Sequence, residues 1–410
     1  MEFRQEQLGN GLTVIAEVNP AAASLAVGFF VATGSRDETD SVAGVSHFLE
    51  HMVFKGTERR TTLDVNRELD EMGAECNAAT SEECTIFYAR VLPEFQGRST
   101  DLLADILRPS LRREDFDLEK KVIIDEIARY DDQPHFRLYE KLMAEHFRAH
   151  PLGRSILGTR ESISALRRED MMGYFGRRYR AGNITAVAAG NLDFERFVDD
   201  LGRLCGGWTA GGADRDRPPA PDHRGKTVIV DEKVVRQNIG LMSQAPSARD
   251  DSRDRHAAHL LSAVLGDSTG SRLYYALVEK GLADEAGTSY SSMDGAGAMM
   301  TFLSCDPGKA PEVLAIARGE MERLMRDGPT EEEMVAAKNK TATGATMNGE
   351  LPLGRLSDVG YDWVYRGQYR PLADVIEEIF AISRGEVLEI ARRLDLTACT
   401  LVALGLAKDV

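Results

Sequence analysis

The chain has 410 residues, and at about 100–200 residues per domain this length predicts two to four domains with room for a sizeable core. Hydrophobic residues make up 43% of the chain and charged residues 28%, which is typical of globular proteins and excludes a disordered or membrane-embedded chain. The formal net charge is -16, from 50 Lys and Arg against 66 Asp and Glu, so the basic surface on which nucleic-acid binding depends is not expected.

The cysteine pattern favours a reduced compartment, and the lack of long apolar segments argues against a membrane-spanning helix. The five cysteines are scattered and form no Cys-x-x-Cys pair: Cys76, Cys84, Cys205, Cys305 and Cys399. Such a set is more typical of an intracellular protein than of a disulfide framework. No stretch approaches the ~18 apolar residues of a transmembrane helix, and the N-terminal residues do not resemble a secretory leader. We therefore expect a cytoplasmic protein that does not engage a membrane.

Apolar runs predict strands that occur in groups. In the first half the expected strands are Leu12–Glu17, Ser24–Ala32, Thr85–Val91 and Ile184–Ala189. In the second half they are Lys226–Asp231, Gln237–Met242, Ala298–Ser304 and Thr397–Ala403. Grouped strands separated by pairs of helices favour an α+β fold with mainly antiparallel sheets. We expect one sheet in each half, covered by helices on one face.

The expected helices follow the same order in both halves. They are Leu63–Met72, 98–108 and 114–130 in the first half, and Arg272–Lys280, 311–325 and 331–341 in the second. Thr330 and Glu333 fit a capping box at the start of the last of these helices. The shared order of helices and strands favours an internal duplication, although any two α+β domains have some likeness of this kind.

A segment rich in Gly and Pro separates the two halves. Residues 206–225 lack apolar periodicity and are typical of an interdomain linker. We therefore predict an N-terminal domain over 1–205, a linker over 206–225, and a homologous C-terminal domain over 226–410.

A cluster of polar residues in the first half has the spacing of a metal site. His47-Phe-Leu-Glu50-His51 lies in a segment, 45–53, whose apolar residues repeat at helical spacing. Residues four apart share one helix face, so both imidazoles can bind one metal ion. Glu50 is placed to reach a water molecule rather than the metal. A catalytic zinc site usually has three protein ligands, so a third is expected elsewhere in the chain.

The helix expected over 114–130 offers two candidates for the third ligand. Glu119 and Glu126 lie two helical turns apart on one face, together with Val122 and Ile123. Carboxylates in an otherwise apolar stripe are costly to bury unless they pair with a cation or bind a metal. The alternative is a solvated helix edge, and the periodicity alone leaves both open.

These residues together resemble the inverted zinc motif of the pitrilysin/insulinase-type (M16) metallopeptidases. The sequence around the motif is similar to that of the branch that includes mitochondrial processing peptidase and its bacterial relatives. The sequence segments on which the resemblance rests are HFLEHMVFKGT, GAECNAATSEECTIFYARV, VIIDEI and HPLGRSILGT. The similarity extends over nearly the whole chain.

The resemblance implies a LuxS/metallohydrolase-like fold duplicated within the chain, and a role for each residue of the motif. It implies that His47, His51 and Glu126 bind one zinc ion, that Glu50 activates the attacking water, and that Glu119 supports the site without touching the metal. It also implies that the strand containing Asn77 and Ala78 pairs with the substrate as an added β-strand. From the residues alone, Asn77 is better explained as a turn residue after Gly73-Ala74.

The second half departs from the family pattern. His256 and His259 correspond in place to the paired histidines, but their spacing is three and no glutamate accompanies them, which favours a structural pair over a weak metal site. Many family members carry an arginine and a tyrosine that grip the substrate. Val278 and Asp284 stand at those positions here, so either substrate binding is rearranged or a partner subunit supplies the pair.

The expected function is that of a zinc metalloendopeptidase that acts on unfolded peptides or oligopeptides. The departures favour the catalytic subunit of a two-chain chamber, with a homologous M16-type chain as partner and a heterodimer favoured over a homodimer. The alternative is a non-catalytic structural subunit of a larger assembly, in which one or more metal ligands are typically lost. A purely structural zinc site would need a closed set of four ligands.

Overall fold

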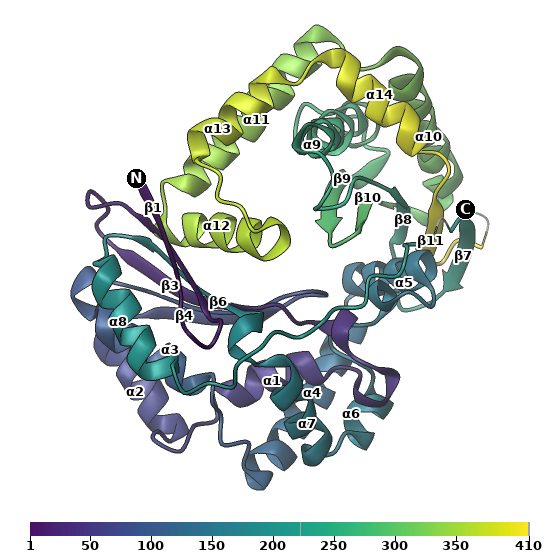
Figure 1. Cartoon of the computed structure of the whole chain (residues 1–410). Coiled ribbons are helices and arrows are strands. Elements are labelled where there is room, and N and C mark those ends of the chain that lie inside the picture. Colours follow the sequence, from purple (N-terminus) through teal and green to yellow (C-terminus); the bar gives the residue numbers. More distant parts are fainter. Residues whose placement is uncertain (222, 409–410) are drawn as a thin grey trace. The chain divides into compact units, whose positions relative to one another are not determined.

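The computed structural model describes residues 1–221 and 223–408, which form two compact units (Figure 1). Unit 1 comprises Met1–Ala128, Arg154–Asp216 and Met347–Arg370, and unit 2 comprises Arg129–Gly153, Arg217–Thr346 and Pro371–Val410. Each unit therefore includes a short segment from the other half of the chain. The consecutive boundaries expected from the sequence stay a proposal, and Asp222 of the expected linker and residues 409–410 lie outside the described part.

Both units are built on a mainly antiparallel sheet, which confirms the α+β prediction. The strands of unit 1 lie in the order β1-β2-β6-β3-β5-β4 and those of unit 2 in the order β7-β11-β8-β10-β9. Unit 1 contains β1 (Glu2–Gln7), β2 (Thr13–Val18), β3 (Leu25–Val31), β4 (Glu75–Thr80), β5 (Thr85–Val91) and β6 (Ile184–Gly190). Unit 2 contains β7 (Gly225–Val230), β8 (Gln237–Gln244), β9 (Ala283–Met293), β10 (Ala296–Cys305) and β11 (Thr400–Gly405).

The two sheets share one topology. Without β1, the order β2-β6-β3-β5-β4 in unit 1 corresponds strand by strand to β7-β11-β8-β10-β9 in unit 2. One pair in each sheet is parallel, β2 with β6 and β11 with β7, and these pairs occupy matching places. Because strand order and direction both agree, the likeness goes beyond that of two arbitrary α+β domains and supports internal duplication.

The helices of the described residues agree broadly with the expected ones. Those of the first half are α1 (Val45–Val53), α2 (Thr62–Met72), α3 (Gln96–Ile106), α4 (Arg113–Asp131), α5 (Pro134–Phe147), α6 (Arg160–Ala165), α7 (Arg168–Arg178) and α8 (Phe194–Cys205). Those of the second half are α9 (Ser252–Gly266), α10 (Ala310–Asp327), α11 (Glu331–Gly349), α12 (Pro352–Arg366), α13 (Leu372–Ala381) and α14 (Arg384–Leu394). The expected helix Arg272–Lys280 contains a π-helical turn at Tyr274–Val278. Thr330 and Glu333 form the predicted capping box. No helix in the described ranges is long and apolar enough to span a membrane.

The expectation that helices cover only one face of each sheet is wrong. In unit 1, α12 lies on one face of the sheet and α3 on the other (Figure 1). The ring of Phe29 lies 6.0 Å from Trp208, which follows α8, whereas the next residue along β3, Phe30, belongs to a buried cluster with residues of α12. In unit 2, Leu241 of β8 belongs to a core with α9 and α10, and its neighbour Met242 packs against α5. Both central sheets are therefore buried on both faces.

Candidate metal centre

Helix α1 carries the His-x-x-Glu-His motif and is held against α4 by an aromatic contact. Every residue of α1 is buried except Glu50 and His51, which are half-buried, and the ring of Phe48 stacks on Phe116 of α4 with centroids 4.8 Å apart. This contact brings together two segments that are far apart in the sequence. It places the turn that carries His47 and His51 opposite the face of α4 that carries Glu119 and Glu126.

The three sequence-predicted ligands come together at this contact. The Nε2 atoms of His47 and His51 lie 3.9 Å and 3.4 Å from Oε2 of Glu126. Tetrahedral ligands at about 2 Å from a zinc ion are separated by about 3.3 Å, close to these distances. Within residues 1–221 and 223–408, these three form the one group of His, Cys, Asp or Glu side chains whose ligand atoms are close enough to hold a metal ion.

Burial and hydrogen bonding at the three ligands fit a bound cation. Oε2 of Glu126 is buried and accepts no hydrogen bond from any described residue, although it faces two imidazole nitrogens. An unpaired buried carboxylate oxygen is costly unless a cation compensates it. Burial, with the neighbouring His51, lowers the pKa of His47 to about 3, so its imidazole is neutral and able to donate a lone pair.

Glu119 fixes the orientation of His51. Its Oε1 lies 2.8 Å from Nδ1 of His51 and its Oε2 lies 2.6 Å from Nζ of Lys55. Burial acts to raise the pKa of Glu119, but the hydrogen bonds from His51 and Lys55 outweigh it and hold this pKa below its ordinary value. A carboxylate that accepts the Nδ1 proton leaves Nε2 as the metal-facing lone pair. Because Glu119 is 3% exposed, the alternative of a solvated helix edge is wrong for this residue.

Glu50 lies on the same helix and is bound by the neighbouring hairpin. The hydroxyl of Thr80, the last residue of β4, donates to Oε2 of Glu50 at 2.6 Å. Burial raises the pKa of Glu50, and the Thr80 hydrogen bond opposes this rise. Thr80 and Lys55 are functional candidates that the sequence did not indicate, since their contacts depend on tertiary packing.

Asn77 and Ala78 lie on β4, which is an edge strand and not a turn. The strand pairs with β5 on one side only, and its residues alternate between exposed and half-buried. The turn expected at Asn77 from the residues alone is therefore wrong. An unpaired strand edge presents backbone N–H and C=O groups to which another extended chain can add.

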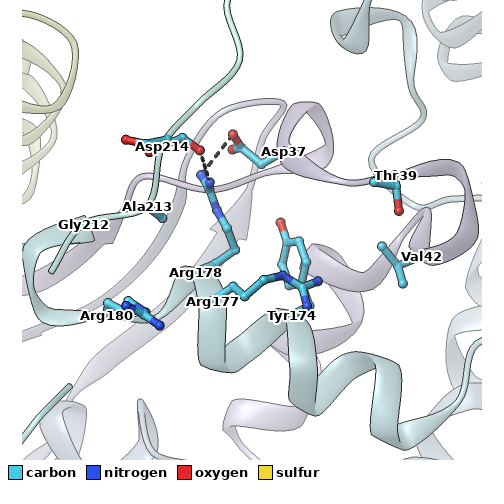
Figure 2. Close-up of a pocket in the computed structure, with 10 residues that line it drawn as sticks. All are labelled: Asp37, Thr39, Val42, Tyr174, Arg177, Arg178, Arg180, Gly212, Ala213 and Asp214. Atoms are coloured by element: carbon cyan, nitrogen blue, oxygen red, sulfur yellow. Dashed lines mark hydrogen bonds and ion pairs between the residues drawn. The ribbon is translucent and has the colours of Figure 1, made fainter. Parts of the chain in front are cut away.

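The loop that leads into α1 is held by buried ion pairs. Asp37 binds Arg178 of α7 at 2.9 Å and Arg215 of the expected linker at 2.8 Å, and all three side chains are at most 8% exposed. Arg178 also donates to the backbone oxygen of Asp214 (Figure 2). Asp37, Arg178 and Asp214 border a cavity of about 350 Å³ beside α7, and none of the three candidate metal ligands lines it.

In unit 2, the residues that correspond to the metal motif are engaged in other contacts. Nε2 of His256 lies 3.0 Å from a carboxylate oxygen of Glu378, and burial lowers the pKa of His259. Asp284 forms an ion pair with Arg236. Val278 is the last residue of the π-helical turn. Val278 and Asp284 stand where many family members carry an arginine and a tyrosine, and neither side chain offers the chemistry of those residues.

Two protein-family models match consecutive parts of the chain. The model described as Insulinase (Peptidase family M16) matches residues 13–160. The model described as Peptidase M16 inactive domain matches residues 165–341. The first match contains every residue of the metal cluster.

Curated relatives and solved structures match over nearly the full length. A protein of Mycobacterium tuberculosis named uncharacterized zinc protease is 31% identical over 401 residues, which cover 95% of this chain and 90% of that protein. One of Rickettsia felis with the same description is 30% identical and covers 98% of this chain and 97% of its own.

The solved structures share the fold at low sequence identity. A protease from Helicobacter pylori has a TM-score of 0.90 at 19% identity and covers 98% of this chain and 99% of its own. A structure from Pseudomonas fluorescens described as peptidase M16 inactive domain has a TM-score of 0.91 at 17% identity, with 99% and 98% covered.

Proposed function

Since the chain belongs to the insulinase-type peptidase family M16, we propose that it is a zinc-dependent endopeptidase that hydrolyses unfolded peptides. The observation that carries the proposal is the convergence of two imidazole nitrogens and one unpaired carboxylate oxygen beside Glu50. Two imidazoles and one carboxylate are a common ligand set for catalytic zinc. The relatives named zinc proteases support the same metal.

In this proposal His47, His51 and Glu126 hold one zinc ion per chain, and Glu119 orients His51 through Nδ1. When bound in such a site, zinc polarises a carbonyl oxygen and makes a water molecule more acidic. The remaining coordination position would be open to water or substrate, because three protein ligands leave one tetrahedral position free.

Glu50 is assigned the proton transfers. It takes a proton from the attacking water and returns it to the leaving nitrogen of the cleaved peptide bond. Because the Thr80 hydroxyl already donates to Oε2, the proton is assigned to Oε1. Burial raises the pKa of Glu50, which makes the carboxylate a stronger base than an exposed glutamate.

The substrate is proposed to add to β4 as an extended strand at Asn77 and Ala78. Pairing of this kind uses backbone hydrogen bonds and depends little on side chains. Only a peptide that is free to extend can pair in this way, which favours unfolded substrates over folded proteins.

A homologous subunit is proposed as partner, in a heterodimer rather than a homodimer. Val278 and Asp284 cannot supply the substrate contacts of an arginine and a tyrosine, and Asp284 is already paired with Arg236.

A cytoplasmic location is also proposed. It is supported by the five cysteines, all of which are free.

The glutamate at position 50 provides the test of catalysis. Glu50→Gln keeps the size of the side chain but removes the base, so zinc content should be unchanged while cleavage of an unstructured peptide falls at least a thousandfold, of the order expected for a lost general base acting with its metal. The assay uses the native protein with any chain that copurifies, and metal content is measured on the same sample. Wild-type turnover in the variant would contradict the assignment.

A non-catalytic structural subunit is the alternative, and no observation favours it. Chains that lose catalysis typically lose a metal ligand, whereas this chain keeps the two histidines of the motif, Glu50 and Glu126. The ligand atoms of His47, His51 and Glu126 lie within 4.8 Å of one another. A preparation that binds zinc but leaves every unstructured peptide intact would revive this alternative.

A further inference from the structure

We propose that Glu38 is a positioning residue for the metal centre: its buried carboxylate holds the first turn of α1, and with it His47, in the orientation that metal binding needs. This inference rests on the proposed function, since it concerns how the proposed ligand is held. Glu38 is 3% exposed and lies in the loop before α1, outside the metal motif.

The contacts of Glu38 are those of a helix cap supplied from a distance. Its Oε2 accepts the backbone N–H of Gly44 at 2.6 Å, and its Oε1 accepts that of Ser46 at 2.7 Å. The first-turn N–H groups of a helix have no partner within the helix and need an outside acceptor. A carboxyl group has two oxygen atoms, so one side chain can accept a hydrogen bond from each of these two N–H groups.

The residue at the N-cap of α1 cannot supply such an acceptor itself. Gly44 has a positive φ of 88°, and a Cβ at this position would lie 2.5 Å from the backbone oxygen of Leu157. Ser, Thr, Asn or Asp, the usual N-cap residues, therefore do not fit here. Glu38 replaces the missing side chain.

Ser46 connects this cap to the first proposed ligand. Its N–H is bound by Glu38, and its hydroxyl lies 2.8 Å from the hydroxyl of Tyr174 of α7, which in turn lies 2.8 Å from that of Thr33. The residue directly before His47 is therefore fixed through both backbone and side chain. Nothing comparable holds the imidazole itself, since Nδ1 of His47 is buried without a hydrogen-bond partner among the described residues.

The loop that carries Glu38 is itself immobilised. Its neighbour Asp37 is paired with Arg178 (Figure 2). Asp37 is also paired with Arg215, and Arg36 is paired with Glu83 at 2.5 Å in a buried contact. A cap anchored in this way is preorganised before any metal binds. Burial raises the pKa of Glu38 to about 8, while the N–H groups of Ser46 and Gly44 act to lower it.

The test replaces Glu38 by glutamine. An amide offers one acceptor oxygen in place of two, so one N–H group of the first turn loses its partner whether Glu38 is charged or neutral. We expect zinc affinity, measured by chelator competition, to fall 10–100-fold, and amide exchange over residues 44–48 of the metal-free protein to rise at least tenfold. The fall in kcat should follow the loss of zinc, with KM unchanged at saturating metal.

A matched control separates positioning from general destabilisation. Glu17 is also a buried carboxylate of unit 1, but it lies in β2 and binds Arg355 at 2.7 Å. Glu17→Gln should lower the melting temperature while zinc affinity of the folded protein stays within twofold of wild type. Zinc affinity within twofold of wild type in Glu38→Gln would overturn the inference.

Two further outcomes keep the inference distinct from the proposed function. If Glu38→Gln does not fold, Tyr174→Phe tests the same turn, because it removes the hydroxyl that binds Ser46. We then expect a smaller loss of zinc affinity, and an unchanged affinity would overturn the inference. If the wild type binds zinc but cleaves no peptide, the proposed function fails while the affinity measurements still decide the role of Glu38.

Discussion

His51 is the proposed ligand whose orientation is best defined by its neighbours. Its Nδ1 faces Glu119 at 2.8 Å, so Nε2 is left to face Glu126 at 3.4 Å. Lys55 neutralises the outer oxygen of Glu119 and keeps that carboxylate ionised. The chain of contacts thus sets the tautomer of one ligand through two side chains that do not touch the metal.

Replacing Glu119 by glutamine should weaken this ligand. The amide keeps the size of the side chain but no longer carries the charge that favours the Nδ1 proton, so zinc affinity is expected to fall 10–100-fold, as measured by chelator competition. Glu114→Gln, on the exposed first turn of the same helix, is the control and should leave the affinity unchanged. Equal zinc affinities in the two variants would contradict the role of Glu119 in orienting His51.

At this scale the sequence predicted part of the site. His47, Glu50 and His51 were recognisable because their spacing on one helix fixes their geometry. Glu126 and Glu119 needed the family resemblance, because the residues alone left a solvated edge open. Lys55 and Thr80 gave no signal, since each acts on a residue that only tertiary packing brings near. Glu38 gave none because its bonds to Gly44 and Ser46 depend on the path of the loop between them.

At the scale of elements, α12 decides how the sheet of unit 1 is buried. The side chains of Leu356 and Val359 pack against β2, β3 and β6, and Arg355 forms a buried pair with Glu17 at 2.7 Å. The backbone approaches so closely at Gly360 that a Cβ would lie 2.3 Å from the ring of Phe30. The helix is therefore a fitted part of the core rather than a cover.

Two glycine-to-alanine substitutions should have opposite effects on stability. Gly360→Ala places a methyl group in the ring of Phe30, and overpacking of about 1–3 kcal/mol should outweigh the helix propensity gained. Gly344→Ala, in α11, meets no atom within 4 Å and should stabilise by about 0.5–1 kcal/mol. Urea unfolding measures both, and a stabilised Gly360→Ala would show that the close approach is not fixed.

The burial of both sheet faces had a sequence signal that the expectation of one covered face overlooked. The strands LAVGFFV, ITAVAAG and TLVALG are apolar apart from Thr185 and Thr400, and every residue in them is buried. Such runs are typical of sheets covered on both sides, whereas a strand with one solvated face alternates. The covering helices α12 and α5 were not foreseen, because each packs in the unit formed mainly by the other half of the chain.

At the scale of the whole molecule, one fold is used twice but the metal cluster occurs once among the described residues. The matching strand orders of the two units support duplication, and the histidines of α9 are engaged with Glu378 or buried. The metal chemistry proposed for this chain is therefore assigned to unit 1 alone.

The proposed partner can be tested with the purified chain. If a homologous subunit supplies the missing grip, the chain alone should cleave an unstructured peptide at least tenfold more slowly than the complex isolated from its source. Native mass spectrometry gives the composition of that complex. Full activity of a homodimer of this chain would contradict the partner proposal.

The central claim is that His47, His51 and Glu126 hold one zinc ion, and metal analysis of wild type and His51→Ala tests it most directly. The measurement is zinc per chain after dialysis against a weak chelator, on samples whose folding is checked by circular dichroism. The account predicts one zinc per chain in the wild type and less than one tenth of that in the variant. A folded His51→Ala protein that retains stoichiometric zinc would contradict it.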